Sequence, residues 1–151
     1  MESFKPQSEI YEARVRKSFT KQNMMATIGT SLAEVRPGFC EIRKPFSDCL
    51  SQQHGFFHGG ALASILDFAG GYAAYTLFVE TDTVPTVEFK LNLLAPADGQ
   101  LVIVQGEVVR LGRTLTVTRG EAIVVKGRIK KTCAMMQQTM MRISGRAEFT
   151  E

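Results

Sequence analysis

Residues 52–78 carry the groups best suited to chemistry, and Asp67 is the most conspicuous of them. It is the only charged residue between Gly59 and Phe78, in a run where apolar residues recur at helical spacing. A helix that is apolar nearly all round is expected to be buried, and a buried carboxylate is costly unless it is paired or used. Asp67 is therefore a candidate general base or nucleophile, with a purely structural hydrogen bond as the alternative.

The start of this helix offers a second chemical group. Gly59 and Gly60 leave backbone N–H groups unobstructed where the helix dipole is positive, and such groups polarise a carbonyl or stabilise an oxyanion. Gly59 precedes Asp67 by eight residues, which is roughly 12 Å along a helix. One reacting carbonyl cannot touch both groups of one helix, so we expect them to come from two copies of the chain. A two-fold dimer with antiparallel helices would make two such sites.

The neighbours of Asp67 one turn away are small, and two of them form the pair Gly70-Gly71. Glycine in a helix interior costs about 1 kcal/mol relative to alanine. The pair therefore suggests that a second subunit or a ligand passes close to the backbone beside Asp67.

The elements that would position these groups follow from periodicity and turn signals. An amphipathic helix is predicted at 9–24, with Ser8 as its N-cap, and an apolar helix at 59–78. Strands are predicted at 28–35, 39–46, 83–95, 101–111, 114–125 and 129–141, with no pattern from 143 onward. Alternation in 83–95 places Thr86 on the face opposite Val87 and Phe89. A long apolar helix must be wrapped, and a strongly curved antiparallel sheet achieves this, which gives an α+β fold.

Length and composition place the chain among ordinary globular proteins. Its 151 residues suggest one domain (1–151), with a helical lead-in at 1–27, a core at 28–142 and a tail at 143–151. A net charge of +3 suits an anionic small ligand and is too small for a nucleic-acid binder. No apolar run or export signal indicates a membrane segment, so we expect a cytoplasmic protein. Three scattered cysteines without a C-x-x-C motif predict reduced thiols and no metal or cofactor.

Three motifs together resemble a known family. They are H-G-G-A-L at 58–62 with Leu66-Asp67, T-V-E-F at 86–89 with Leu91 and Pro96, and V-R-x-G-R-T at 109–114. With these motifs the sequence resembles the hotdog-fold proteins, and among them the PaaI-like acyl-CoA thioesterases, over about residues 28–141. The resemblance implies a hotdog fold, hydrolysis of a medium-chain or aryl acyl-CoA, and a homodimer or homotetramer built as a dimer of dimers.

The resemblance also implies roles for individual residues. The Gly59 N–H would polarise the thioester carbonyl, Asp67 would be base or nucleophile, Gln52 would lie near the thioester, and Thr86 would help hold water. The family pattern has Asn or Gln at position 52, and a second Gln follows here. The CoA tail would run past Arg110, Arg113 and Thr114, and His58, Gly60 and Phe57 would also border the substrate.

Several assignments stay open at this stage. His58 would either hold the corner by hydrogen bonds or act as a general acid, and Arg110 and Arg113 would either bind phosphate or be solvated. Rival functions are an acyl-thioester hydratase or dehydratase and a non-catalytic acyl-CoA-binding module. The missing downstream Phe-Pro-Gly pattern weighs against the hydratase, and the retained Asp67 weighs against the binding module.

Overall fold

Helix α3 (Gly59–Tyr75) is the element around which the chain is built, in a computed structural model that describes residues 4–145. One side of α3 faces the sheet and is buried, including Leu62, Ile65 and Leu66. The sheet approaches α3 closely, because a Cβ on Gly106 would lie 2.3 Å from the main-chain carbon of Ala69. The predicted long apolar helix is therefore confirmed, and glycine in the facing strand permits its tight packing.

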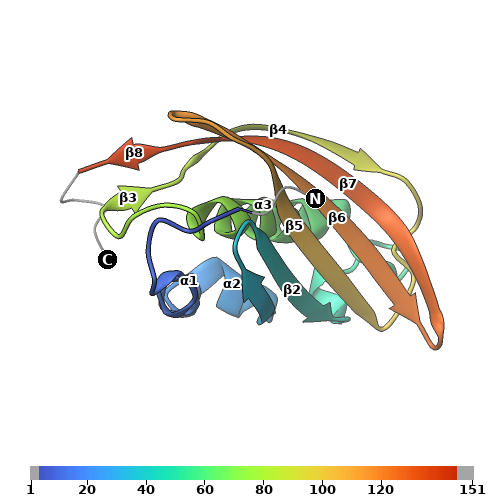
Figure 1. Ribbon diagram of the computed structural model, residues 1–151. Helices are drawn as coiled ribbons and strands as arrows, with labels where there is room; N and C mark the ends of the chain where they lie inside the picture. The colour runs from blue at the N-terminus through green and yellow to red at the C-terminus, as the bar shows by residue number, and fades with distance from the viewer. Residues whose placement is uncertain (1–3, 146–151) are drawn as a thin grey trace.

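Six antiparallel strands form one curved sheet around α3 (Figure 1). Their order across the sheet is β1-β2-β5-β6-β7-β4, so β1 and β4 are its two edges. The strands are β1 (Ser31–Arg36), β2 (Phe39–Pro45), β4 (Thr86–Leu93), β5 (Leu101–Leu111), β6 (Leu115–Lys126) and β7 (Ile129–Met141). This confirms the predicted α+β fold, in which a curved antiparallel sheet wraps around a long helix.

The N-terminal segment differs from the prediction. The single helix expected at 9–24 is two helices, α1 (Tyr11–Thr20) and α2 (Asn23–Ile28). Ser8 is not the N-cap: Ile10 holds that position, and the Ser8 hydroxyl donates to the Glu80 carboxylate instead. Helix α2 ends at Gly29, whose φ of 74° is the left-handed cap that glycine favours. The first strand consequently begins later than predicted.

Helix α1 is fixed over the C-terminal half of α3. The Arg14 guanidinium donates to the carbonyl oxygens of Phe78 and Asp82 at 2.8 and 2.9 Å, and it lies 3.8 Å from the centroid of the Tyr75 ring. A guanidinium with carbonyl acceptors and an aromatic face holds one geometry. α1 thus forms a wall beside α3.

Strand β4 contains an irregularity that changes the face on which Thr86 lies. Phe89 stands opposite Gln138 on the inner face of β7, but the register shifts between Thr86 and Glu88. Thr86 therefore stands opposite Met140, which is also inward-facing and buried. The unbroken alternation predicted from the sequence is wrong at this point, because a β-bulge turns Thr86 toward α3.

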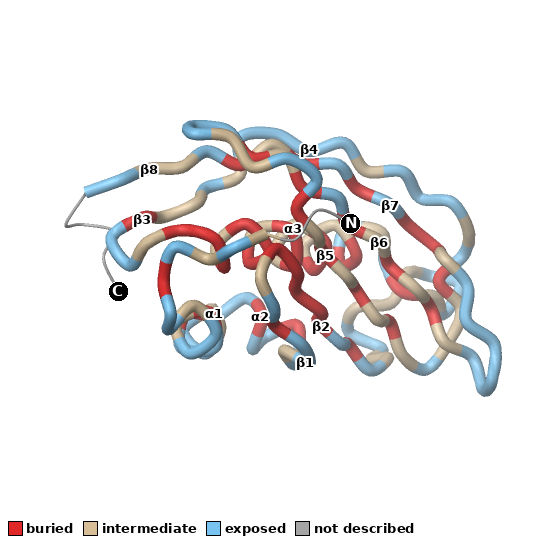
Figure 2. The backbone as a smooth tube through the Cα atoms, viewed as in Figure 1, coloured by how far each residue is buried: buried red, intermediate tan, exposed pale blue. Residues whose placement is uncertain are grey.

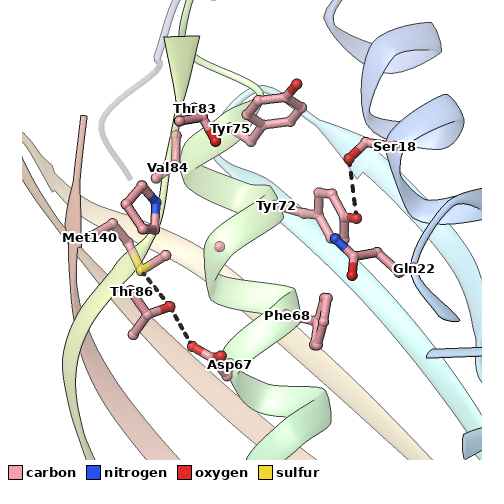
Figure 3. Close-up of a pocket in the computed structure, with 12 residues that line it drawn as sticks. Ser18, Gln22, Asp67, Phe68, Tyr72, Tyr75, Thr83, Val84, Thr86 and Met140 are labelled. Atoms are coloured by element: carbon pink, nitrogen blue, oxygen red, sulfur yellow. Dashed lines mark hydrogen bonds between the residues drawn. The ribbon is translucent and has the colours of Figure 1, made fainter. Parts of the chain in front are cut away.

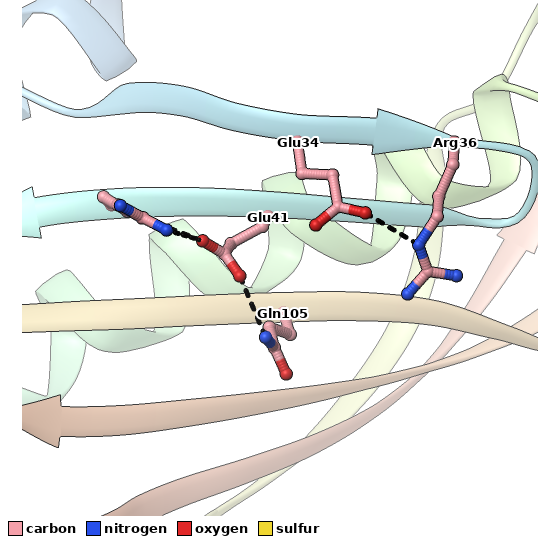
Figure 4. Close-up of polar contacts among 5 residues, drawn as sticks. Glu34, Arg36, Glu41 and Gln105 are labelled. Atoms are coloured by element: carbon pink, nitrogen blue, oxygen red, sulfur yellow. Dashed lines mark hydrogen bonds and ion pairs between the residues drawn. The ribbon is translucent and has the colours of Figure 1, made fainter. Parts of the chain in front are cut away.

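The outer face of the sheet is polar near β2, as the alternation predicts. Cys40 and Ile42 point into the core, while Glu41 lies on the outer face between β2 and β5 (Figure 4). Its carboxylate accepts from Arg43 at 2.8 Å and from the Gln105 amide at 2.9 Å, so a buried charge is fully paired. Beside it, Glu34 and Arg36 of β1 form a more exposed pair.

The strands of the C-terminal half, and the turns between them, lie largely where the sequence predicts. The strands at 101–111, 114–125 and 129–141 are present to within a residue, and a short 3-10 helix (Asp48–Leu50) interrupts the loop before α3. The predicted patternless tail is wrong in its first residues, since β8 (Ile143–Ser144) pairs with β3 (Asp82–Thr83) beside the Arg142–Asp82 ion pair. The rest of that tail, 146–151, lies outside the described residues.

Within 4–145, no helix has the length and apolar character needed to cross a membrane.

Candidate active site

The carboxylate of Asp67 is held from two strands of the sheet. The Thr86 hydroxyl of β4 donates to Asp67 Oδ1 at 2.7 Å, as Figure 3 shows. The same hydroxyl lies 3.7 Å from Met140 Sδ, but its single hydrogen goes to the far stronger carboxylate acceptor. From β7, the Gln138 side-chain amide donates to Oδ1 at 2.9 Å and to the Asp67 carbonyl oxygen at 3.0 Å.

Asp67 is half-buried and borders a pocket of about 250 Å³ between α1, α3 and the start of β4 (Figure 3). Half of the lining residues are aromatic or aliphatic. The polar ones include Ser18 of α1 and Gln22, the N-cap of α2. The lining residues are Ser18, Gln22, Asp67, Phe68, Gly71, Tyr72, Tyr75, Thr83, Val84, Pro85, Thr86 and Met140. A carboxylate at the edge of a pocket with aromatic and polar walls is an arrangement suited to acid–base or nucleophilic chemistry on a bound ligand.

Sequence reasoning missed Gln138. Its side chain is only 1% exposed, and it occupies an inward position on β7 between the buried Met136 and Met140. A polar residue in the inward register of a strand was the available signal. Gln138 also accounts for one of the paired glycines, because a Cβ on Gly70 would lie 1.9 Å from Gln138 Oε1. What approaches the helix at Gly70 is therefore a side chain of the same chain, and not the second subunit or ligand that the sequence suggests.

The other end of α3 forms the predicted glycine corner, with one correction. His58 is the N-cap, and its Nδ1 accepts from the Gly60 N–H at 2.9 Å, so the Gly60 donor is occupied. Within residues 4–145, the Gly59 N–H has no hydrogen-bond acceptor. Within the described part of the chain, the corner thus offers one free backbone donor at the positive end of the helix dipole, whereas the sequence predicts two.

A second and larger hollow, of about 920 Å³, surrounds this corner. Gln52, Phe57 and His58 all border it together with both glycines. The Gln52 carbonyl oxygen accepts from the Gly55 N–H at 3.0 Å, and its side-chain oxygen accepts from the His54 N–H. Phe57 is buried, with its ring edge-on to Phe46 at 5.2 Å. The structure therefore brings Gln52, Phe57, His58, Gly59 and Gly60 together.

Asp67 and Gly59 border different hollows of the one chain. The structure thus divides the predicted residues into two groups at the two ends of α3, with Asp67 and Thr86 in one and the glycine corner in the other. This arrangement agrees with the spacing argument that one chain cannot present both groups to a single carbonyl.

Arg110, Arg113 and Thr114 belong to neither group. They are exposed at the tip of the β5–β6 hairpin and border neither hollow. The Thr114 carbonyl oxygen accepts from the Arg142 N–H at 2.7 Å, which ties the tip to the end of β7. The hairpin consequently lies at the Asp67 end of the sheet, since Thr86, Met140 and Thr116 stand side by side there.

The cysteines are remote from this chemistry. Burial raises the pKa of the Cys40 and Cys133 thiols, which lie in the core. Cys49 is exposed but borders neither hollow. A thiol with a raised pKa is a poor nucleophile.

Comparison with known proteins relates the chain to thioesterases and esterases. The sequence profile of the thioesterase superfamily matches residues 54–131. A protein of Saccharolobus solfataricus, provisionally assigned as an esterase, is 30% identical over 105 residues, which are 70% of this chain and 69% of that protein. The crystal structure of a thioesterase family protein from Silicibacter pomeroyi superposes with a TM-score of 0.88 at 42% identity, covering 89% of this chain and 99% of the other.

The fold also resembles that of the E. coli PaaI protein from the phenylacetic acid degradation operon. The TM-score is 0.81 at 19% identity, with 91% of this chain and 96% of PaaI covered. Together with the profile match over 54–131, these similarities establish that the chain belongs to the thioesterase superfamily and has the hotdog fold of its PaaI-like members.

Proposed function

We propose that the protein is an acyl-CoA thioesterase that hydrolyses a medium-chain or aryl acyl-CoA to the free acid and CoA. The observation that carries the proposal is the Asp67 carboxylate, held by Thr86 and Gln138 at the edge of an aromatic-lined pocket. Membership of the thioesterase superfamily supports thioester hydrolysis as the reaction class. The acyl group and the site residues are our own assignment.

Each active site would combine Asp67 of one subunit with Gly59 of another. The side of α3 away from the sheet remains partly exposed. Most of the residues there are small, including Gly60, Ala63, Ser64 and Gly71, and they surround Asp67. A second copy with its helix antiparallel would cover this face and bring its own glycine corner to Asp67.

The edge strand β4 supports the same dimer. Among residues 4–145 no strand pairs with its outer side, and most of β4 is exposed (Figure 2). Val87 and Phe89 are 57% and 50% exposed. An exposed edge that carries large apolar side chains is a template for pairing with another strand. A second β4 would satisfy its free backbone groups and cover its side chains, so a homodimer or a dimer of dimers is the assembly we propose.

The chemistry then follows from the two groups. The Gly59 N–H would donate to the thioester carbonyl oxygen and stabilise the negative charge that develops there. Asp67 would either remove a proton from the water that attacks the carbonyl carbon, or attack that carbon itself and form an acyl–Asp67 anhydride that water then hydrolyses to the free acid. The C–S bond would break with CoA thiolate as the leaving group. The pocket beside Asp67 would hold the acyl group, and the aromatic side chains of Phe68, Tyr72 and Tyr75 in its wall support an aryl or medium-chain substrate.

A thiol-release assay over short, medium, long and aryl acyl-CoAs tests this function. We expect kcat/KM to be highest for an aryl or medium-chain acyl group, because the pocket beside Asp67 has three aromatic rings in its wall and a limited volume. If no acyl-CoA is hydrolysed but calorimetry on the same protein shows tight acyl-CoA binding, the protein is a non-catalytic acyl-CoA-binding module and not a thioesterase.

Arg113→Ala is expected to weaken recognition of the CoA nucleotide. Arg113 is exposed at the hairpin tip near the Asp67 end of the sheet, where a guanidinium can bind phosphate. We expect KM to rise about tenfold for the preferred acyl-CoA and to change little for the corresponding acyl-pantetheine, which lacks the nucleotide. Arg128→Ala, at the exposed turn between β6 and β7, is the matched control. Equal effects of Arg113→Ala on both substrates would place Arg113 away from the nucleotide.

A further inference from the structure

The side-chain amide of Gln138 makes two hydrogen bonds to Asp67. Gln138 is buried on the inner face of β7, and its Nε2 donates both to Asp67 Oδ1 at 2.9 Å and to the Asp67 carbonyl oxygen at 3.0 Å. These two acceptors lie on the same residue, one on its side chain and one on its backbone. A single amide group therefore ties the carboxylate to the helix that carries it.

Thr118 of β6 determines which end of that amide faces Asp67. Thr118 stands directly opposite Gln138 in the sheet, is fully buried, and donates its hydroxyl hydrogen to Gln138 Oε1 at 3.2 Å. The reversed amide would turn Oε1 toward two oxygen acceptors on Asp67, so that acceptor would face acceptor and both Gln138 hydrogen bonds would be lost. The Thr118 hydroxyl thus favours the orientation in which Nε2 meets the carboxylate.

Helix α3 leaves room for this contact at Gly70. A Cβ on Gly70 would lie 1.9 Å from Gln138 Oε1 and 2.8 Å from Thr118 Oγ1. Glycine in a helix interior destabilises the helix relative to alanine, yet only glycine admits the amide and the hydroxyl at this position. The hydrogen bonds from Thr118 of β6 to Gln138 of β7, and from Gln138 to Asp67 of α3, form a chain that we call the relay. Gly70 of α3 leaves the space for it.

The relay selects one oxygen of Asp67 for chemistry. Oδ1 accepts from both Thr86 and Gln138, so the two donors that hold the carboxylate bind the same oxygen and leave Oδ2 to other partners. We propose that Gln138, oriented by Thr118, is a positioning residue that fixes the Asp67 carboxylate so that Oδ2 is the oxygen presented to water or to the thioester carbon. This inference rests on the proposed function, since it assigns the geometry of the same reaction.

The first test is the pair Thr118→Val and Thr118→Ser. Valine keeps the shape of threonine but removes the hydroxyl, and serine keeps the hydroxyl. We expect Thr118→Val to lower kcat about tenfold with KM nearly unchanged, because a misplaced catalytic group reduces the chemical step more than binding. Thr118→Ser, which keeps the hydroxyl, should retain most of the wild-type kcat. Thr116→Val is the control: Thr116 is buried on the same face of β6, two residues away, and its hydroxyl has no partner among the described residues.

Gln138→Met tests the relay at its centre. Methionine has a similar length but no donor, and we expect kcat to fall roughly 10- to 100-fold. In an Asp67→Asn background the same change should have no further effect on residual activity, because Gln138 acts through Asp67; a general loss of packing would still lower it. If Gln138→Met does not fold, as judged by thermal melting and gel filtration, the Thr118 pair decides the question. Wild-type kcat in folded Gln138→Met, or in Thr118→Val, overturns the inference.

Crystal structures of the wild type and Thr118→Val provide a measurement independent of turnover. We expect the Asp67 side chain to take one rotamer in the wild type and to change or spread over several in the variant. An unchanged rotamer overturns the positioning role, whatever the activity. By contrast, an ordered wild-type carboxylate in a protein without thioesterase turnover would refute the proposed reaction and not the relay that orders Asp67.

Discussion

Replacing Asp67 with Asn is expected to lower kcat for acyl-CoA hydrolysis by a factor of roughly 100 or more, as for loss of a general base or nucleophile. Asn keeps an oxygen that can accept from Thr86 and Gln138, so the hydrogen bonds at Oδ1 persist. The change falls on Oδ2, which becomes an amide nitrogen that can neither take a proton nor attack a carbonyl carbon. The thiol-release assay with the preferred acyl-CoA measures the loss.

The matched control is Ser64→Ala, on the same partly exposed face of α3 one turn earlier. The Ser64 hydroxyl donates only to the Gly60 carbonyl within its own helix, and Ser64 borders neither hollow. We expect near-wild-type turnover from this variant and an unchanged oligomer from both. Equal turnover of wild type and Asp67→Asn would remove Asp67 from the mechanism.

The parts of the fold that could be predicted are those where local signals and the global structure agree. The hairpin strands of β5, β6 and β7 carry apolar residues in long runs bounded by turn residues, and they form as expected. The N-terminal helix was harder to predict. Its amphipathic pattern continues through residues 21–22, where the structure breaks between α1 and α2. Helix α1 packs against β1 and α3, and no local pattern reports those contacts.

The candidate site shows the same division. Asp67 and Gly59 stand out in the sequence because a lone acid in an apolar helix and a glycine at its start are local anomalies. Gln138 lies 71 residues from Asp67, and only the strand order brings β7 against α3. Thr86 reaches Asp67 because of a bulge, and a regular period of two cannot predict a change of face.

Replacing Gly59 with proline is expected to abolish most of the activity, whereas replacing it with alanine is not. Gly59→Pro removes the one free N–H at the helix start, and proline is compatible with the first helical position. His58, before it, has φ −68° and ψ 137°, the extended conformation that a residue before proline adopts. Gly59→Ala adds the same Cβ against Leu93, whose exposed side chain can move, but keeps the N–H. We expect the proline variant to lose activity roughly 100-fold and the alanine variant to retain most of it.

Co-expression of Gly59→Pro with Asp67→Asn then tests whether the site is shared. Either variant alone carries a defect in every site. If each site takes Gly59 from one subunit and Asp67 from its partner, random pairing gives both intact groups in about a quarter of the sites, so activity should rise to about a quarter of the wild-type value. If each site were built within one chain, no site in the mixture would hold both groups, and activity would stay at the level of the separate variants. Gel filtration of the mixture confirms that the subunits have assembled, so a low activity in assembled protein would contradict the shared site directly.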